Sequence, residues 1–203
     1  IKSYMPKVAC MMLAILFFIQ VGSSEVSAAA YWPEAPETVS PAVILMELST
    51  GTVLYEKNST EAHYPASITK IMTTLVALEN SDLNEVVTFS DRAIDETYGS
   101  GIARDYGEQM TMEQCLYAVM LESANECAFA VAEHVGGTME NCVDMMNAKA
   151  KELGCQNTHF ANPNGLQDEN HYTCAADMAL IAQAAYENET FRIITGTKIY
   201  TIP

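Results

Sequence analysis

The stretch Pro65-Ala66-Ser67-Ile68-Thr69-Lys70 decides how the rest of this 203-residue chain is interpreted. It stands between a β-like segment at residues 43–55 and an apolar run at residues 71–78 that predicts a buried helix. If Ser67 opens that helix, Lys70 lies one turn later on the same face, with Cβ atoms roughly 5–6 Å apart. The spacing therefore places a hydroxyl beside an amine.

This pair has a chemical and a structural interpretation. A serine hydroxyl is a poor nucleophile until a neighbouring base takes its proton, and lysine serves as that base only when its pKa is lowered. Burial at the start of an apolar helix would lower it. The structural alternative is a serine N-cap followed by a solvated lysine, and an isolated Ser-x-x-Lys match favours this alternative.

The first thirty residues have the order of a secretory signal peptide. Lys2 and Lys7 precede an apolar run at residues 8–19, and small residues follow at 26–30. We therefore predict a signal peptide at 1–30, export to the cell envelope, and a partial catalytic domain at 31–203. An uncleaved membrane anchor is the alternative, although twelve apolar residues are short for a membrane-spanning helix, which needs about 20.

The charge of the chain restricts its partners. It has 26 acidic and 10 basic residues, a formal net charge of −16. Nucleic acid and anionic lipid both require basic surface, so we expect no nucleic-acid partner and no electrostatic lipid binding. A neutral or cationic peptide substrate remains compatible with this charge.

An odd number of cysteines follows the predicted signal peptide. None forms a Cys-x-x-Cys pair, and no His/Cys cluster has zinc spacing. We therefore expect free, buried thiols that pack as small hydrophobic groups, and the sequence leaves any disulfide pairing open. The five residues are Cys115, Cys127, Cys142, Cys155 and Cys174.

Local patterns predict mixed secondary structure. Residues 43–48 and 52–55 read as a hairpin that turns at Gly51, and residues 85–89 as a short strand. Residues 91–109 read mostly as surface loop. A final strand is expected at residues 197–202.

Capping residues predict the helices. Thr111, with Gln114 three residues on, fits a capping box for a helix at 112–121, and Gly136 ends a later helical pattern at 128–135. Two further helices are expected, one from Thr138 to about residue 153 and one from Thr173 to residue 186. Asn162-Pro163-Asn164-Gly165 predicts a turn.

The tripeptide Ser123-Ala124-Asn125 separates two apolar helical segments. A polar tripeptide at such a break either satisfies backbone groups as a helix cap or faces a cavity. The tripeptide alone favours a cap.

Taken together, the two motifs resemble the penicillin-recognising serine acyl-transferases, and most closely the low-molecular-weight D-alanyl-D-alanine carboxypeptidases. Ser-x-x-Lys is a signature of that group. The resemblance covers residues 43–203. It extends to segments outside the two motifs: Met146-Asn147, Leu153-Gly154, Thr158-His159-Phe160, Asn162-Pro163-Asn164-Gly165-Leu166, His171-Tyr172-Thr173 and Asp177-Met178-Ala179-Leu180.

The resemblance implies specific roles for four residues. Ser67 would be the acylated nucleophile and Lys70 the base. Ser123 would pass a proton to the leaving amine, and Asn125 would hold the substrate amide and orient Lys70. The implied substrate is the D-Ala–D-Ala terminus of a peptidoglycan stem peptide, the implied inhibitors are β-lactams, and no metal or organic cofactor is implied.

The resemblance also implies an α+β fold of the β-lactamase/transpeptidase type. This fold has an antiparallel sheet with helices packed against it and a mainly helical subdomain. The family's third motif, Lys-Thr-Gly on a core strand, is missing, and Gly196-Thr197-Lys198 has the wrong order. We expect that motif, and any C-terminal membrane-associating segment, downstream of residue 203. The chain by itself is therefore expected to be an incomplete domain and a poor catalyst.

Two rival functions share the first motif. A class A β-lactamase usually carries aspartate where Ala124 stands, and no acidic loop residue suited to activating a deacylating water is evident. A non-catalytic penicillin-binding or sensor domain would keep the pocket without turnover.

Overall fold

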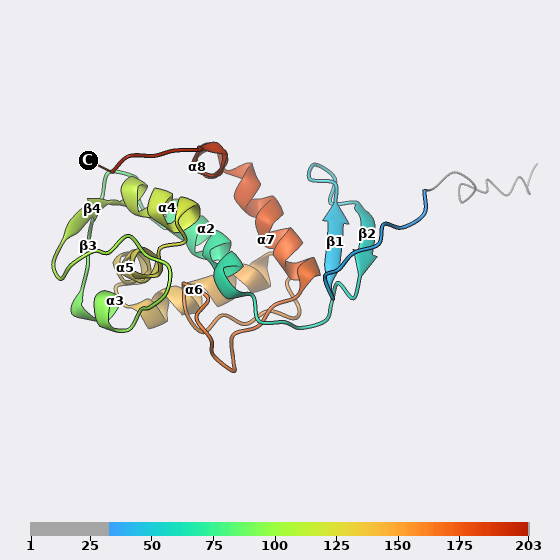
Figure 1. Cartoon of the computed structure of the whole chain (residues 1–203), viewed down its shortest axis with the longest axis horizontal. Coiled ribbons are helices and arrows are strands. Elements are labelled where there is room, and N and C mark those ends of the chain that lie inside the picture. The colour runs from blue at the N-terminus through green and yellow to red at the C-terminus, as the bar shows by residue number, and fades with distance from the viewer. Residues whose placement is uncertain (1–32, 203) are drawn as a thin grey trace, which may run out of the picture. The chain divides into compact units, whose positions relative to one another are not determined.

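The computed structural model describes residues 33–202, so the predicted signal peptide lies outside the described residues. The chain divides into two units, Ile1–Glu37 and Thr38–Pro203, and the elements below belong to the second. None of the helices within 33–202 has the length and apolar character needed to cross a membrane. Figure 1 shows the order of the elements along the chain.

The predicted hairpin is confirmed. Strands β1 (Val43–Met46) and β2 (Val53–Lys57) pair antiparallel, and Gly51 has φ +69°, which only glycine adopts freely. The Glu47 carboxylate accepts hydrogen bonds from the backbone and side chains of the turn residues Ser49 and Thr50. These bonds lower the pKa of Glu47 to about 2.

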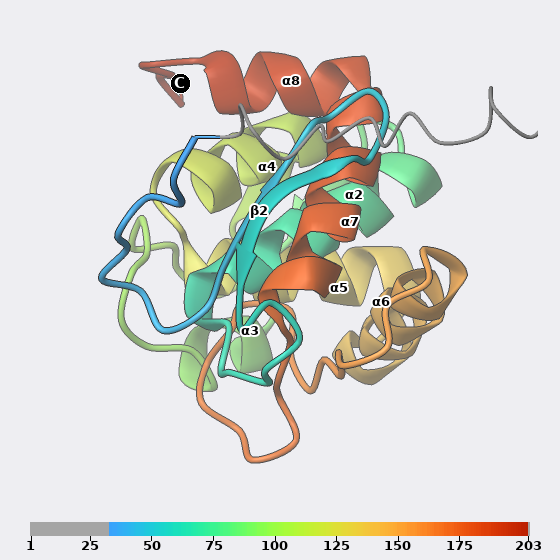
Figure 2. The same cartoon turned by 90° about the vertical axis from the view of Figure 1, so that its right-hand side faces the viewer.

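Helix α2 (Lys70–Asn80) is the buried helix predicted from the apolar run, and it follows a short 3₁₀ helix, η2 (Ala66–Thr69). A helix that is apolar on most of its surface must be covered on most sides. Five later helices contact α2: α4 (Met112–Leu121), α5 (Asn125–Gly136), α6 (Met139–Glu152), α7 (Ala175–Glu187) and α8 (Glu189–Gly196). Helix α7 lies between α2 and the hairpin (Figures 1 and 2). Helix α2 is therefore a central element of this unit, and the Ser-x-x-Lys segment runs through η2 and ends at Lys70, the first residue of α2.

The region predicted as one surface loop is more ordered than expected. Strand β3 (Val86–Thr88) is confirmed, and it pairs antiparallel with β4 (Gln109–Thr111), which the sequence did not indicate. A short helix, α3 (Asp91–Asp95), begins after Ser90, whose hydroxyl accepts a hydrogen bond from the Ala93 N–H. The serine N-cap was the missed signal.

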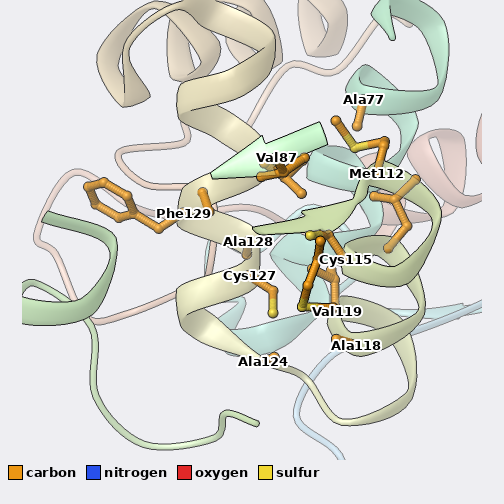
Figure 3. Close-up of a cluster of buried hydrophobic side chains, with 14 of the residues drawn as sticks. Ala77, Val87, Met112, Cys115, Ala118, Val119, Ala124, Cys127, Ala128 and Phe129 are labelled. Carbon is orange, nitrogen blue, oxygen red and sulfur yellow. The ribbon is translucent and has the colours of Figure 1, made fainter. Parts of the chain in front are cut away.

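The predicted capping box is confirmed, and helix α4 spans Met112–Leu121. The Thr111 hydroxyl accepts from the Gln114 N–H, while the Gln114 side chain accepts from the Thr111 N–H. Helix α5 (Asn125–Gly136) begins three residues earlier than its periodicity suggested. Apolar side chains of α4, α5 and β3 form one core cluster, drawn in Figure 3.

Three helices complete the unit: α6 (Met139–Glu152), α7 (Ala175–Glu187) and α8 (Glu189–Gly196). Helix α6 agrees with the prediction. Thr173 was predicted to cap α7, but the N-cap is the next residue, Cys174, whose sulfur accepts a hydrogen bond from the Asp177 N–H. The preceding residue, Thr173, instead hydrogen-bonds through its hydroxyl to the Thr158 hydroxyl.

The predicted final strand at residues 197–202 is not formed. A strand requires a hydrogen-bonded neighbour, and within residues 33–202 no strand pairs with this segment. The segment is held by side chains instead, since the Tyr200 ring stacks on Tyr117 with centroids 3.8 Å apart. Helix α8, which precedes it, was not predicted.

The five cysteines within residues 33–202 have free thiols, as expected. Cys115, Cys127, Cys142 and Cys174 are buried and Cys155 is partly exposed. Burial raises the pKa of Cys115 to about 12, so this thiol stays protonated and packs as an apolar group.

Candidate active site

Ser67 and Lys70 meet at the junction of η2 and α2. Side chains three residues apart eclipse one another in a 3₁₀ helix, so this turn aligns the two residues more closely than an α-helix would. Lys70 Nζ lies 3.3 Å from Ser67 Oγ. Ser67 is exposed, whereas Lys70 is only 2 % exposed. The structure thus presents an accessible hydroxyl to a buried amine.

The Lys70 amine is enclosed by three acceptors. Besides Ser67 Oγ, Nζ donates to Asn125 Oδ1 and to the backbone carbonyl of Asn164, each at 2.7 Å. An ammonium has three N–H bonds, so every one of them is used. The charged form of Lys70 is therefore fully hydrogen-bonded without water.

Burial nevertheless disfavours that charge. Desolvation lowers the pKa of Lys70 to about 8, and the negative charge of Glu126 partly opposes this effect. At pH 7 a group with this pKa is neutral in about a tenth of the molecules. Lys70 can therefore accept a proton near neutral pH, as a base for Ser67 must.

Asn125 is brought to Lys70 by the break between α4 and α5. Ser123, in the break, has φ +60°, a left-handed conformation that is uncommon for a residue other than glycine. This reversal lets α5 begin with the Asn125 side chain directed at Lys70. The second motif therefore forms both a helix start and part of the site.

Ser123 is not in hydrogen-bonding contact with Ser67 or Lys70. Its Oγ is enclosed and has no hydrogen-bond partner among the described residues. An enclosed hydroxyl without a partner costs free energy, and such groups occur at functional sites. The structure thus joins Ser67, Lys70 and Asn125 directly and leaves Ser123 two residues away with a free hydroxyl.

Residues 98–102, a mostly exposed loop as predicted, make hydrogen bonds to Asn125 and Glu126. The Asn125 amide group donates to the Tyr98 carbonyl, and its backbone N–H donates to the Ser100 carbonyl. The Glu126 carboxylate accepts from the Ile102 N–H at 2.6 Å. Residues 98–102 are therefore fixed to the start of α5.

The turn at residues 162–165 is part of the site, which the sequence did not indicate. Its Asn164 carbonyl binds Lys70, and the Pro163 carbonyl accepts from Thr73 Oγ1 at 2.5 Å. Gly165 has φ +86° and passes so close to η2 that a Cβ there would lie 2.0 Å from the Ala66 carbonyl oxygen. Ala66 itself has φ +50°, so the backbone on both sides of this contact is in the left-handed region.

The sequence of this chain matches a known family over most of its length. The family model described as D-alanyl-D-alanine carboxypeptidase matches residues 29–202. The D-alanyl-D-alanine carboxypeptidase DacF of Bacillus subtilis is 42 % identical over 159 residues, which cover 76 % of this chain and 41 % of that protein. The chain therefore spans about two fifths of that relative's length.

Solved structures agree with this match. The D-alanyl-D-alanine carboxypeptidase DacD of Francisella tularensis is 36 % identical, with a TM-score of 0.76 over 80 % of this chain and 41 % of that one. The S216A mutant of the Streptomyces K15 DD-transpeptidase is 32 % identical, with a TM-score of 0.79 over 83 % of this chain and 69 % of that one. The expected α+β, transpeptidase-like fold is confirmed, and the chain belongs to the D-alanyl-D-alanine carboxypeptidase family.

Proposed function

We propose that the protein containing this chain is a serine-type D-Ala–D-Ala carboxypeptidase. It removes the terminal D-alanine from peptidoglycan stem peptides through an acyl-enzyme on Ser67. The observation that carries this proposal is the exposed Ser67 hydroxyl 3.3 Å from the buried Lys70 amine, whose pKa is lowered to about 8. Membership of the family and the names of the relatives support the same reaction.

Acylation begins with neutral Lys70. Its nitrogen accepts the proton of Ser67 Oγ while Oγ attacks the carbonyl carbon of the penultimate D-alanine. Negative charge then develops on the carbonyl oxygen. The first N–H groups of a helix have no intrahelical acceptor, so the Ser67 N–H is available to stabilise that oxyanion.

The leaving amine takes its proton through Ser123. The unpartnered Ser123 hydroxyl can give its proton to the amine nitrogen and receive another from Lys70. The C–N bond then breaks and free D-alanine leaves. Asn125 donates one amide hydrogen to Tyr98, so its second amide hydrogen is available to a substrate carbonyl.

Deacylation reverses the proton movements. Lys70, neutral again, accepts a proton from water as the water oxygen attacks the ester carbon. The ester bond to Ser67 breaks, and Oγ regains its proton. β-Lactams would enter by the same first step, because their strained amide offers the same carbonyl to Ser67.

The substrate places this activity outside the cytoplasm. Peptidoglycan lies in the cell envelope, so the predicted signal peptide at 1–30 fits the proposed substrate. The acidic balance of the chain suits a peptide partner and not a nucleic acid.

The test is labelling of the full-length protein with fluorescent penicillin, together with an assay of D-alanine release from a pentapeptide. Mass spectrometry should place the label on Ser67, and Ser67→Ala should lose label and release together. Ser81→Ala, at the end of α2, is the control and should behave as wild type.

Other results would contradict the proposal in distinguishable ways. A label on a different residue would exclude Ser67 as the nucleophile. Fast β-lactam hydrolysis without D-alanine release would indicate a β-lactamase. A stable label on Ser67 without any D-alanine release would indicate a sensor domain.

A further inference from the structure

His171 is buried beside the Ser67 turn without touching Ser67 or Lys70. The residue is only 1 % exposed, and its ring packs edge-on against Phe160 with ring centroids 5.7 Å apart. Nε2 lies 2.7 Å from Thr69 Oγ1, and Nδ1 lies 3.0 Å from the Ala161 backbone nitrogen. Both ring nitrogens thus have partners from segments distant in the sequence.

These partners fix the protonation of the ring. The Ala161 N–H can only donate, so Nδ1 must accept and carries no hydrogen. In the neutral ring the hydrogen is then on Nε2, which donates to Thr69 Oγ1. If Nδ1 also carried a proton, its N–H would point at the Ala161 N–H, and the hydrogen bond between them would be lost. The geometry therefore requires neutral His171.

The two partners belong to the two segments that hold Lys70. Thr69 lies between Ser67 and Lys70 in η2. Ala161 begins the loop whose Asn164 carbonyl accepts from Lys70 Nζ at 2.7 Å. His171 is therefore a link between the turn that carries the nucleophile and the loop that carries an acceptor for the base.

The turn requires such support. Ala66 has φ +50°, a left-handed conformation that is unfavourable for a residue with a Cβ. Backbone in that conformation persists when surrounding contacts hold it. The His171 bond to Thr69 is one of these contacts.

We propose that His171 is a positioning residue that sets the Ser67–Lys70 geometry for acylation, and that protonation of its ring releases this geometry. The proposal rests on the proposed function, because acylation of Ser67 is the step that His171 supports. The charged groups that act on His171 are Asp168, which favours the protonated ring, and His159, which disfavours it. Burial is the larger effect and lowers the pKa of His171 to about 4.

The first test separates the two hydrogen bonds in the full-length protein. His171→Asn keeps an acceptor near the Nδ1 position but loses the bond to Thr69, and His171→Gln keeps a donor near Nε2 but loses the bond to Ala161. Both should slow penicillin acylation by about 10–10²-fold, since a displacement of 1 Å costs about this much. The dissociation constant of the complex that precedes acylation should change much less.

Thr69 provides the matched pair, because its side chain does not contact the reacting atoms. Thr69→Val keeps the shape but removes the hydroxyl, and it should slow acylation like His171→Asn. Thr69→Ser restores the hydroxyl and should recover most of the rate. His134→Gln, at the far end of α5, is the histidine control and should acylate as wild type.

The second test does not require acylation. Because the pKa of His171 falls from about 6.5 in the unfolded chain to about 4 in the fold, its stabilising effect is complete above pH 6.5 and is lost as the pH falls to 4. The thermal midpoint of the wild type should drop over this interval, and that of His171→Asn should drop less. Histidine NMR should show His171 titrating near pH 4 with its hydrogen on Nε2.

The outcomes separate this inference from the proposed function. Wild-type protein that forms no acyl-enzyme would overturn the proposed function, while the NMR tautomer would still decide whether the link exists. Acylation of the His171 variants and Thr69→Val at the wild-type rate would overturn the positioning role. So would a loss confined to the thermal midpoint or to the dissociation constant, because that pattern indicates a purely structural residue.

Discussion

Two opposing effects set the charge of the Lys70 amine. Three acceptors stabilise its ammonium, whereas burial disfavours the charge and lowers the pKa to about 8. Desolvation lowers the pKa far enough that about a tenth of the molecules carry neutral Lys70 at pH 7, but the charged form still predominates. The lysine is therefore balanced between a structural cation and a base.

This balance predicts the pH dependence of acylation. In the proposed mechanism the neutral amine is the reactive form, so the rate should rise with pH and level off above a midpoint near 8. Stopped-flow measurements with fluorescent penicillin would give this profile. Lys70→Ala should abolish acylation with the fold largely intact, and Lys70→Arg should abolish it at every pH because guanidinium stays charged.

Exposed Lys151 provides the control for these variants, and Lys151→Ala should keep the wild-type profile. A flat profile between pH 6 and 9, or acylation of Lys70→Ala at the wild-type rate, would show that Lys70 is not the base.

At the residue scale the sequence indicated the side chains that meet at the candidate site better than the backbone groups that hold them. Ser67, Lys70 and Asn125 meet as expected, because each is a side chain whose type signals its chemistry. The Asn164 carbonyl was not predicted, because every residue has a backbone carbonyl and only the fold selects one. Ser123 keeps its proposed role without a contact that supports it in this structure.

At the element scale, the close approach of the 162–165 turn to η2 depends on Gly165. Its φ is +86°, and a Cβ at this position would lie only 2.0 Å from the Ala66 carbonyl oxygen, so there is no room for a side chain. Gly165→Ala should therefore push the turn away from η2 and withdraw the Asn164 carbonyl from Lys70. We expect a loss of several kcal/mol in the free energy of unfolding, more than the roughly 1–2 kcal/mol of a left-handed alanine alone, and slower acylation.

Gly154 provides a closely matched control for this prediction. It also has φ +86°, but no atom lies within 4 Å of the position of its Cβ. Gly154→Ala therefore has the same backbone strain without the clash. Urea unfolding of both variants should show the larger loss for Gly165→Ala, and equal losses would show that the contact with Ala66 is unimportant.

The elements that were predicted correctly are those specified by local signals. The capping box at Thr111 and the apolar periodicity of α2 depend on residues within one or two turns. The wrong predictions concern elements whose structure depends on contacts with residues far away in the sequence. Strand β4 forms because it pairs with β3, and residues 197–202 lack a strand to pair with among the described elements.

At the scale of the whole molecule, the prediction concerns export. The small residues after the apolar run predict signal cleavage near Ala28 or Ala30. N-terminal sequencing of protein secreted by an expressing bacterium should therefore begin close to Ala29 or Tyr31. Replacing both Ala28 and Ala30 by bulky residues should block cleavage of the signal peptide. Replacing Ala35 by a bulky residue should leave cleavage unchanged. Mature protein that retains residues 8–19 would favour the alternative, an uncleaved membrane anchor.

The Lys70 ammonium joins three stretches of chain that are far apart in the sequence. Its bonds to Asn125 and Asn164 span 55 and 94 residues. Contacts of such separation close large loops, and they form only after much of the chain has come together. The backbone hydrogen bonds of α2, in contrast, join residues only four apart in the sequence. Under the proposed mechanism, a chain that has formed these local bonds but not the long-range contacts of Lys70 should therefore be helical yet unreactive toward a β-lactam.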